Sequence, residues 1–240
     1  MKREIVGRRR AFLRAMAGLA VLPAVAGAAW AQSPLKIGIV GSGRVGGTLG
    51  ELWLKAGHEV MFSSLDLEHD KALAAKLGGK ARAGTSKEAA AFGEVVFIAV
   101  PYGALPQVGK DLAGELKGKV VLDACNPFPN RDGEIANWAR EKGAGLASAV
   151  LLPGARLVRG FNAIGAARLP VLGKEANKTG MPIAGDDAGA IAVASRLVRD
   201  AGLEPVVVGG LAMGKHLMPG TPLAGEQSPE KLRQVAATLK

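Results

Sequence analysis

Apolar and polar residues alternate along the chain in blocks that predict a sheet covered by helices. Short continuous apolar runs are typical of strands buried on both faces, and longer segments with helical spacing separate them. In residues 43–57, Val45, Leu49 and Trp53 recur every four positions on one helical face. The predicted strands cover residues 35–40, 58–62, 94–100, 119–124, 156–161, 181–185 and 204–209, and the predicted helices cover 43–57, 66–78 and 187–202.

This order of elements predicts an α/β fold with a doubly wound parallel sheet. We expect one main domain over residues 35–170. Residues 171–240 are then a small C-terminal αβ extension that packs on the same sheet. The chain shows no repeat period and no low-complexity tract after its first 31 residues.

The first 31 residues have the layout of a secretory signal peptide. A basic stretch runs to Arg14, an apolar run covers residues 15–31, and the small-residue pattern of Ala29 and Ala31 offers a cleavage site. Arg9-Arg10, followed by a Phe-Leu pair, resembles the twin-arginine signal. We therefore expect cleavage after residue 31, passage through the twin-arginine export machinery, and a periplasmic or secreted location.

The leader has two alternative interpretations, a general secretory signal and a membrane anchor. A general secretory leader shares the basic start and stays open as an alternative. A membrane anchor is disfavoured because the apolar run is shorter than the roughly 20 residues that a bilayer requires. No later segment of the sequence is apolar enough to span a membrane, so no stable membrane span is expected.

Removal of the leader halves the net charge. The chain carries +10 in full, and without residues 1–31 it keeps 25 basic and 20 acidic residues, a net charge of +5. These charges are scattered, without a basic run or interleaved aromatic residues, so no nucleic-acid partner is expected. The single Cys125 excludes an internal disulfide.

A glycine-rich loop follows the first predicted strand directly. Gly41, Gly43 and Gly46 in GSGRVGGTLG have the G-x-G-x-x-G spacing of dinucleotide-binding folds, between an apolar strand and an amphipathic helix. The first glycine permits the tight turn, the second lets a pyrophosphate approach the backbone, and the third lets helix and strand pack closely. A plain glycine-rich turn is the alternative.

The end of the second predicted strand bears on which dinucleotide binds. Folds that bind NAD usually place an acid there, whereas those that bind NADP supply Arg, Ser or Lys for the extra phosphate. Here Ser63 and Ser64 occupy the position, and Asp66 can instead cap the next helix. This pattern favours NADP and leaves NAD possible.

Five blocks, read in order, resemble a known family: GSGRVGGTLG, GHEVMFSS, VFIAVPYGAL, DACNPFP and LVRGFNAI. The chain is similar to the coenzyme F-420 (deazaflavin)-dependent NADP reductases and their relatives over roughly residues 35–225. Those relatives include the ferric-reductase domain of certain transmembrane metalloreductases. The resemblance implies an NAD(P)-binding Rossmann fold with a short C-terminal elaboration. It also implies hydride transfer between NADP(H) and a deazaflavin, flavin or ferric-chelate acceptor.

The same resemblance implies a set of site residues. Arg44 and Val45 would offer backbone to the pyrophosphate, and Ser42 its backbone and hydroxyl. The family usually has Arg after the second serine, where this chain has Leu65. The implied cofactor-binding residues are Gly41, Ser42, Gly43, Arg44, Val45, Gly46, Ser63, Ser64, Ala99, Val100, Pro101, Asn126 and Pro127, and Phe161 and Asn162 would approach the acceptor.

Few side chains are candidates for acid–base work, which agrees with direct hydride transfer between two stacked rings. His58 is expected to be structural and His69 exposed, while His216 belongs to a loop that could fold toward the cleft. Cys125 is expected to pack rather than react, and Tyr102 either reaches the ribose or covers a loop. No metal is expected, because no pair of His or Cys has ligand spacing.

The sequence leaves two other functions open. One is an exported nucleotide-binding protein without turnover, acting as a sensor or assembly partner. The other is a reductase of imines or 2-hydroxy acids, which requires a Lys or His proton donor beside the nicotinamide. Related folds often dimerise through their C-terminal part, so a homodimer is possible.

Overall fold

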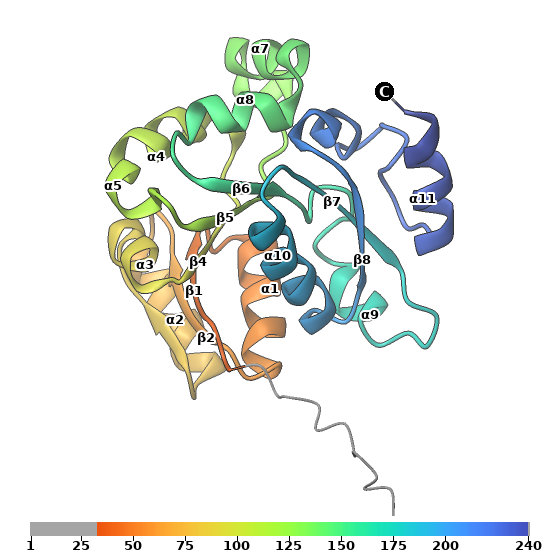
Figure 1. The fold of residues 1–240 in the computed structure, drawn as a ribbon. Coiled ribbons are helices and arrows are strands. Elements are labelled where there is room, and N and C mark those ends of the chain that lie inside the picture. Colours follow the sequence, from red (N-terminus) through yellow and green to blue (C-terminus); the bar gives the residue numbers. More distant parts are fainter. Residues whose placement is uncertain (1–32, 240) are drawn as a thin grey trace, which may run out of the picture. The chain divides into compact units, whose positions relative to one another are not determined.

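The computed structural model describes residues 33–239, and the predicted signal peptide over residues 1–31 lies outside the described residues. Within the described part, eight strands form one sheet in the order β3-β2-β1-β4-β5-β6-β7-β8 (Figure 1). The strands are β1 (Lys36–Val40), β2 (Glu59–Ser63), β3 (Ala81–Ala83), β4 (Val95–Ile98), β5 (Val120–Asp123), β6 (Arg156–Arg159), β7 (Gly180–Gly185) and β8 (Glu204–Gly209).

Helices cover both faces of this sheet (Figure 1). The α-helices are α1 (Arg44–Lys55), α2 (Leu67–Leu77), α3 (Ser86–Phe92), α4 (Leu105–Asp111), α5 (Ala113–Leu116), α6 (Pro129–Asp132), α7 (Glu134–Lys142), α8 (Ala144–Leu151), α9 (Leu169–Leu172), α10 (Ala188–Asp200) and α11 (Pro229–Thr238), and the 3₁₀ helices are η1 (Tyr102–Ala104) and η2 (Leu211–His216). Helices α1 and α10 pack on one face, and α3, α5 and α8 pack on the other.

The side chains on the two faces of the central strands belong to two separate apolar cores. In β4, Val95 and Phe97 join the core under α1 and α10, while Val96 and Ile98 join the core under α3 and α8. This alternation follows from the strand geometry, in which successive side chains point to opposite faces. Because both faces are buried, the strand is a continuous apolar run, as the sequence predicted.

The predicted α/β fold is confirmed, and its strand order 3-2-1-4-5 is that of a Rossmann fold. One feature differs from a wholly parallel sheet: β7 runs antiparallel to β6, through Val158↔Gly185 and Arg159↔Ala184. The β7–α10–β8 unit is therefore an αβ extension on the same sheet, in the opposite sense. The predicted domain limit near residue 170 falls within α9, between β6 and β7, and remains a prediction.

Two short elements between β2 and β4 escaped the sequence prediction. Strand β3 has only three residues and includes Arg82, which is too little for a period to show. Helix α3 does carry a signal, because Thr85 and Glu88 form a capping box at its start. Within residues 33–239, no helix combines the length and apolarity that a bilayer crossing demands.

Candidate functional site

The glycine loop joins β1 to α1 and leaves its backbone open at the start of the helix. Gly41 has φ +99°, a conformation that favours glycine, and its N–H donates to Ser63 O at 2.9 Å. A Cβ at Gly43 would meet nothing within 4 Å, so bare main chain borders open space there. At Gly46 a Cβ would lie 2.1 Å from Gly41 O, so only glycine lets α1 pack this closely.

The first turn of α1 suits an anion. Its N-terminus has no side-chain cap and no acidic residue in the first turn, whereas α2 and α10 are capped by Asp66 and Asp187. The first N–H groups of a helix lack partners within the helix, and the helix dipole makes this end positive. Arg44 and Val45 therefore present backbone donors where a pyrophosphate would rest.

The buried carboxylate of Asp70 is hydrogen-bonded to two of the three serine hydroxyls that the family resemblance assigned to phosphates. Asp70, from α2, is fully buried and accepts hydrogen bonds from Ser42 Oγ and, at 2.9 Å, from Ser64 Oγ. The N–H of Ser42 donates to Ser63 O as well. The hydroxyl and the N–H of Ser42 are thus engaged within the protein, and the contact of Ser42 with a pyrophosphate stays a prediction.

Ser63 also has a partner within the protein. Its side chain is fully buried, and Oγ donates to Ile39 O at 2.7 Å. The side chain points into the fold, and the contact of this hydroxyl with a 2′-phosphate stays a prediction. Of Ser42, Ser63 and Ser64, Ser64 alone is half-buried, and Leu65 beside it is fully exposed.

A chain of cavities lies over the carboxyl ends of β1, β4 and β5. One of about 340 Å³ is lined by the loop after β4 and by two arginines, Arg44 and Arg131. It shares Val45, Ala124 and Asn126 with a larger cavity of about 560 Å³. Ligands of doubly wound sheets bind in this position, where the strand order reverses.

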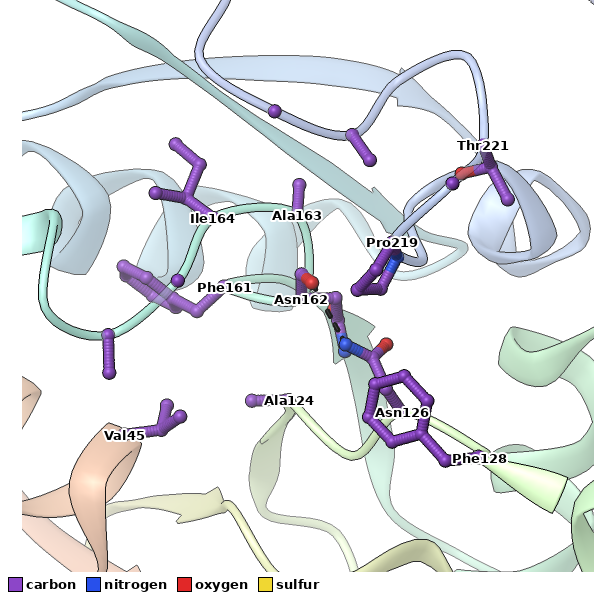
Figure 2. Close-up of a pocket in the computed structure, with 15 residues that line it drawn as sticks. Val45, Ala124, Asn126, Phe128, Phe161, Asn162, Ala163, Ile164, Pro219 and Thr221 are labelled. Atoms are coloured by element: carbon purple, nitrogen blue, oxygen red, sulfur yellow. Dashed lines mark hydrogen bonds between the residues drawn. The ribbon is translucent and has the colours of Figure 1, made fainter. Parts of the chain in front are cut away.

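The larger cavity is drawn in Figure 2, where residues from the loop after β5, from the loop after β6 and from the C-terminal segment surround one space. Asn126 Nδ2 donates to Asn162 O at 2.9 Å, and this bond joins two of its walls (Figure 2). The side chain of Asn162 is buried, and neither its Nδ2 nor its Oδ1 has a partner. The lining residues are Val45, Ala124, Asn126, Phe128, Phe161, Asn162, Ala163, Ile164, Gly165, Ala166, Pro219, Gly220, Thr221, Ala224 and Gly225.

Phe161 lines the cavity, but its ring is buried in the core of the protein. It is the one non-glycine residue with positive φ (62°) among residues 33–239, and its ring is 2% exposed. The ring makes edge-to-face contacts with Trp53 and Phe97, with centroids 5.7 and 5.9 Å away. A residue held in this region costs on the order of 1–3 kcal/mol, and each aromatic pair contributes about 0.5–1.5 kcal/mol. These contacts offset the strain.

The remaining predicted cofactor residues fall into two groups. Ala99, Val100 and Pro101 line the smaller cavity together with Asn126. Pro127 is buried and lines neither cavity. The sequence did not identify Arg131, whose guanidinium donates to Asn126 O at 2.9 Å and stacks over Phe128. The hydrogen bonds that the Arg131 guanidinium donates to the Asp132 carboxylate raise the pKa of Arg131.

The candidate acid–base groups lie away from the cavities. His58 is structural, as predicted: Leu35 N–H donates to its Nδ1, and its Nε2 bonds Asp200 at 2.8 Å. His216 ends η2 and does not line either cavity. Tyr102 is fully buried beside Ser148, and burial raises its pKa to about 12, so it does not reach a ribose in the cleft.

Cys125 is 1% exposed, and burial raises the pKa of its thiol well above the usual value. A protonated, shielded thiol is a poor nucleophile, in agreement with the predicted packing role. Among residues 33–239, no three His, Cys, Asp or Glu side chains gather in a way that could hold a metal ion.

The family model described as NADP oxidoreductase coenzyme F420-dependent matches residues 36–127. Over these residues the chain is similar to the F420-dependent NADP oxidoreductase family. The resemblance predicted for residues 35–225 is thus confirmed over β1 to β5 and the Asn126-Pro127 pair. The match and the fold identify an NAD(P)-dependent oxidoreductase.

Solved structures share the fold of this oxidoreductase. A hypothetical protein, SMa0349 from Sinorhizobium meliloti, has 23% identity and a TM-score of 0.66, covering 81% of this chain and 95% of its own. A putative F420-dependent NADP-reductase from Arthrobacter sp. FB24 has 22% identity and a TM-score of 0.65, covering 75% and 87%.

An imine reductase from Myxococcus stipitatus, in complex with NAD+, has 18% identity and a TM-score of 0.53. The match covers 75% of this chain and 56% of that enzyme. Comparison with curated protein sequences gives no significant match.

Proposed function

We propose that this protein transfers a hydride between NADP(H) and a deazaflavin or flavin bound in the larger cavity. The observation that carries the proposal is the cavity of about 560 Å³ that adjoins the glycine loop and shares Val45 and Asn126 with the smaller cavity. A dinucleotide on the loop would extend along the smaller cavity toward Asn126. Its nicotinamide end would then meet the larger space.

The residues of the loop fit the phosphates of such a cofactor. Gly43 leaves open space above the main chain, and the first turn of α1 lacks a capping side chain. When bound, the cofactor would supply the hydride. The protein would then need to position the two rings and exclude water, and would not need to transfer a proton.

The composition of the cavity walls favours a ring acceptor over an imine or a hydroxy acid. The polar side chains that line the two cavities are Asn126, Asn162, Thr221, Arg44 and Arg131. Reduction of an imine or a 2-oxo acid requires a proton donor near the substrate, and no His, Lys or carboxylate lines these walls. Hydride transfer between stacked rings makes no such demand.

NADP(H) is supported by the description of the family and by the lack of an exposed carboxylate directly after β2. Leu65 stands where the family usually has Arg, and the Ser64 hydroxyl donates to Asp70, so a 2′-phosphate would gain no guanidinium there. We therefore expect NADPH to be preferred over NADH by a small factor.

The test is the transfer of deuterium from NADPH labelled at nicotinamide C4. Purified protein is incubated with a deazaflavin, with FMN, or with ferric citrate, and NADPH oxidation is followed. Deuterium recovered on the deazaflavin ring supports the proposal. Turnover with ferric citrate alone would assign the ferric-chelate acceptor instead. Tight NADPH binding without oxidation by any acceptor would select the nucleotide-binding protein without turnover.

We also propose that the protein acts in the periplasm or outside the cell. The support is the arrangement of Arg9-Arg10 before an apolar run with a small-residue cleavage site. A dinucleotide made in the cytoplasm would then cross the membrane already bound, since the twin-arginine route carries folded proteins. Replacement of Arg9-Arg10 by Lys-Lys should leave the protein in the cytoplasmic fraction. Unchanged export would overturn the twin-arginine assignment.

A further inference from the structure

A buried ion pair lies beneath the walls of both cavities. Asp123 and Arg159 end the neighbouring strands β5 and β6 and are register partners on the same face of the sheet. Both side chains are 0% exposed, and Arg159 Nη1 lies 2.6 Å from Asp123 Oδ2. Neither side chain lines a cavity.

The ion pair is hydrogen-bonded to the backbone of Cys125 and to the side chain of Asn126. Arg159 Nη1 also donates to Cys125 O at 3.0 Å, and Asp123 Oδ1 accepts from Cys125 N–H at 2.7 Å. Arg159 Nη2 donates to Asn126 Oδ1 at 3.2 Å. Both ends of the Cys125 residue and one end of the Asn126 amide are thus held by two charged groups.

These bonds fix which way the Asn126 amide points. Its Oδ1 faces the guanidinium, which can only donate, so its Nδ2 must face the opposite way. There it donates to Asn162 O, across the larger cavity wall. The orientation of the amide follows from the charge behind it, and a rotated amide would set two donors against each other.

Stability alone does not explain a charged pair at this place. Burial of two charges carries a desolvation cost, and well-packed apolar side chains of similar size are often as stable or more so. An apolar pair would pack the sheet but would remove the donors to Asn126 Oδ1 and Cys125 O, and the acceptor for Cys125 N–H.

We propose that Arg159 is a positioning residue that holds Asn126 against the nicotinamide end of the cofactor. This inference rests on the proposed function, because it requires a dinucleotide in the cleft. The hydrogen bonds of Arg159 go to Asp123 at the end of β5 and to Cys125 and Asn126 after it, and none of these residues belongs to the glycine loop or to the end of β2. Its influence is therefore confined to the nicotinamide half of the ligand and spares the adenine half.

The experiment compares two probes by calorimetry on the purified full chain: NADPH and 2′,5′-ADP, which has only the adenine half. Arg159→Lys keeps a positive charge opposite Asp123 but loses the planar fork that reaches Asn126. We expect the Kd for NADPH to rise about tenfold, as for the loss of one charged hydrogen bond. The Kd for 2′,5′-ADP should stay within about twofold, since these contacts do not change.

Arg156→Lys is the matched control. Arg156 opens the same strand and is also paired with an aspartate, Asp187, but lies outside both cavities. It should leave both affinities unchanged. If Arg159→Lys does not fold, the double variant Asp123→Leu/Arg159→Met, which replaces the pair by apolar side chains, gives the same comparison.

Equal weakening of both probes, or no change in NADPH affinity, would overturn the role of Arg159 while leaving the proposed function intact. Failure of the unmodified protein to bind either probe would overturn the proposed function, and the role of Arg159 with it. Weaker NADPH binding in Arg156→Lys would also count against the assignment, because it would show that any strain in β6 has this effect.

Discussion

Leu65 offers a direct test of how the cleft recognises the adenine end of the cofactor. It follows Ser64 after β2, and its side chain is fully exposed, at 108% of the reference value. Leu65→Arg therefore removes no packing and creates no cavity. In the proposed complex, the new guanidinium would stand beside the 2′-phosphate of NADPH.

The expected gain is modest because the site is open to water. A hydrogen bond to a charged group contributes about 1.5–3 kcal/mol when it is sheltered, whereas exposed ion pairs typically contribute about 0.2–1 kcal/mol. The carboxylates of Asp66 and Glu68 are also exposed nearby and compete for the guanidinium. We expect a gain of about 1 kcal/mol, which is roughly a fivefold tighter Kd for NADPH.

Calorimetric titration with NADPH and with NADH, at low salt and at 0.5 M salt, measures this effect. NADH lacks the 2′-phosphate, so its affinity should not change, and high salt should remove most of the NADPH gain. Val207→Arg is the control, because it adds the same charge at another exposed apolar position, on β8. Equal gains for NADPH and NADH, or an equal gain in the control, would refute this placement of the 2′-phosphate.

Three further outcomes follow from the structure. Gly46→Ala should abolish nucleotide binding or folding, because the new Cβ would lie 2.1 Å from Gly41 O, and thermal unfolding with and without NADPH measures both. Cys125 should resist thiol reagents in the folded protein, and Cys125→Ala should keep its hydride-transfer rate; fast labelling before unfolding would contradict the buried, protonated thiol. A hydrogen bond with Arg156 lowers the pKa of Asp187 to about 2, so its stabilising contribution is present above pH 4 and is lost as pH falls toward 2. Urea unfolding between pH 5 and pH 2 should show a shallower decline for Asp187→Asn, and an unchanged decline would exclude this pair as a cause.

The sequence predicted the parts of the fold that depend on local patterns. Continuous apolar runs identify β1, β4 and β5, and the glycine spacing identifies the loop at the start of α1. The reversed direction of β7 was beyond reach, because an apolar run has the same composition in either direction. It depends on a pairing of only Val158 and Arg159 with β7.

The geometry of the candidate site was predictable from the sequence where the backbone decides it, whereas the hydrogen-bond partners of its side chains were not. The glycines have the predicted surroundings, but the hydroxyls of Ser42 and Ser63 turn inward to Asp70 and to Ile39 O. Asp70 looks like an ordinary charged residue on an amphipathic helix, so nothing in the sequence indicates that it is buried. The ion pair of Asp123 and Arg159 is equally hidden, since the sequence does not tell the buried Arg159 from Arg156, the other arginine of β6, which is paired with Asp187.

The long-range hydrogen bonds of α1 and of His58 after it affect when this part of the fold can form during biosynthesis. Trp53 Nε1 donates to Leu197 O, 144 positions later, and His58 meets Asp200, 142 positions later. Translation at about 5–20 residues per second makes the ribosome spend on the order of 7–30 s between these partners. During that interval the nascent α1 lacks its contact with α10, so we expect stable capture of the proposed coenzyme only near the end of synthesis. Any quality check before export would then test, in one step, whether the last third of the polypeptide has arrived.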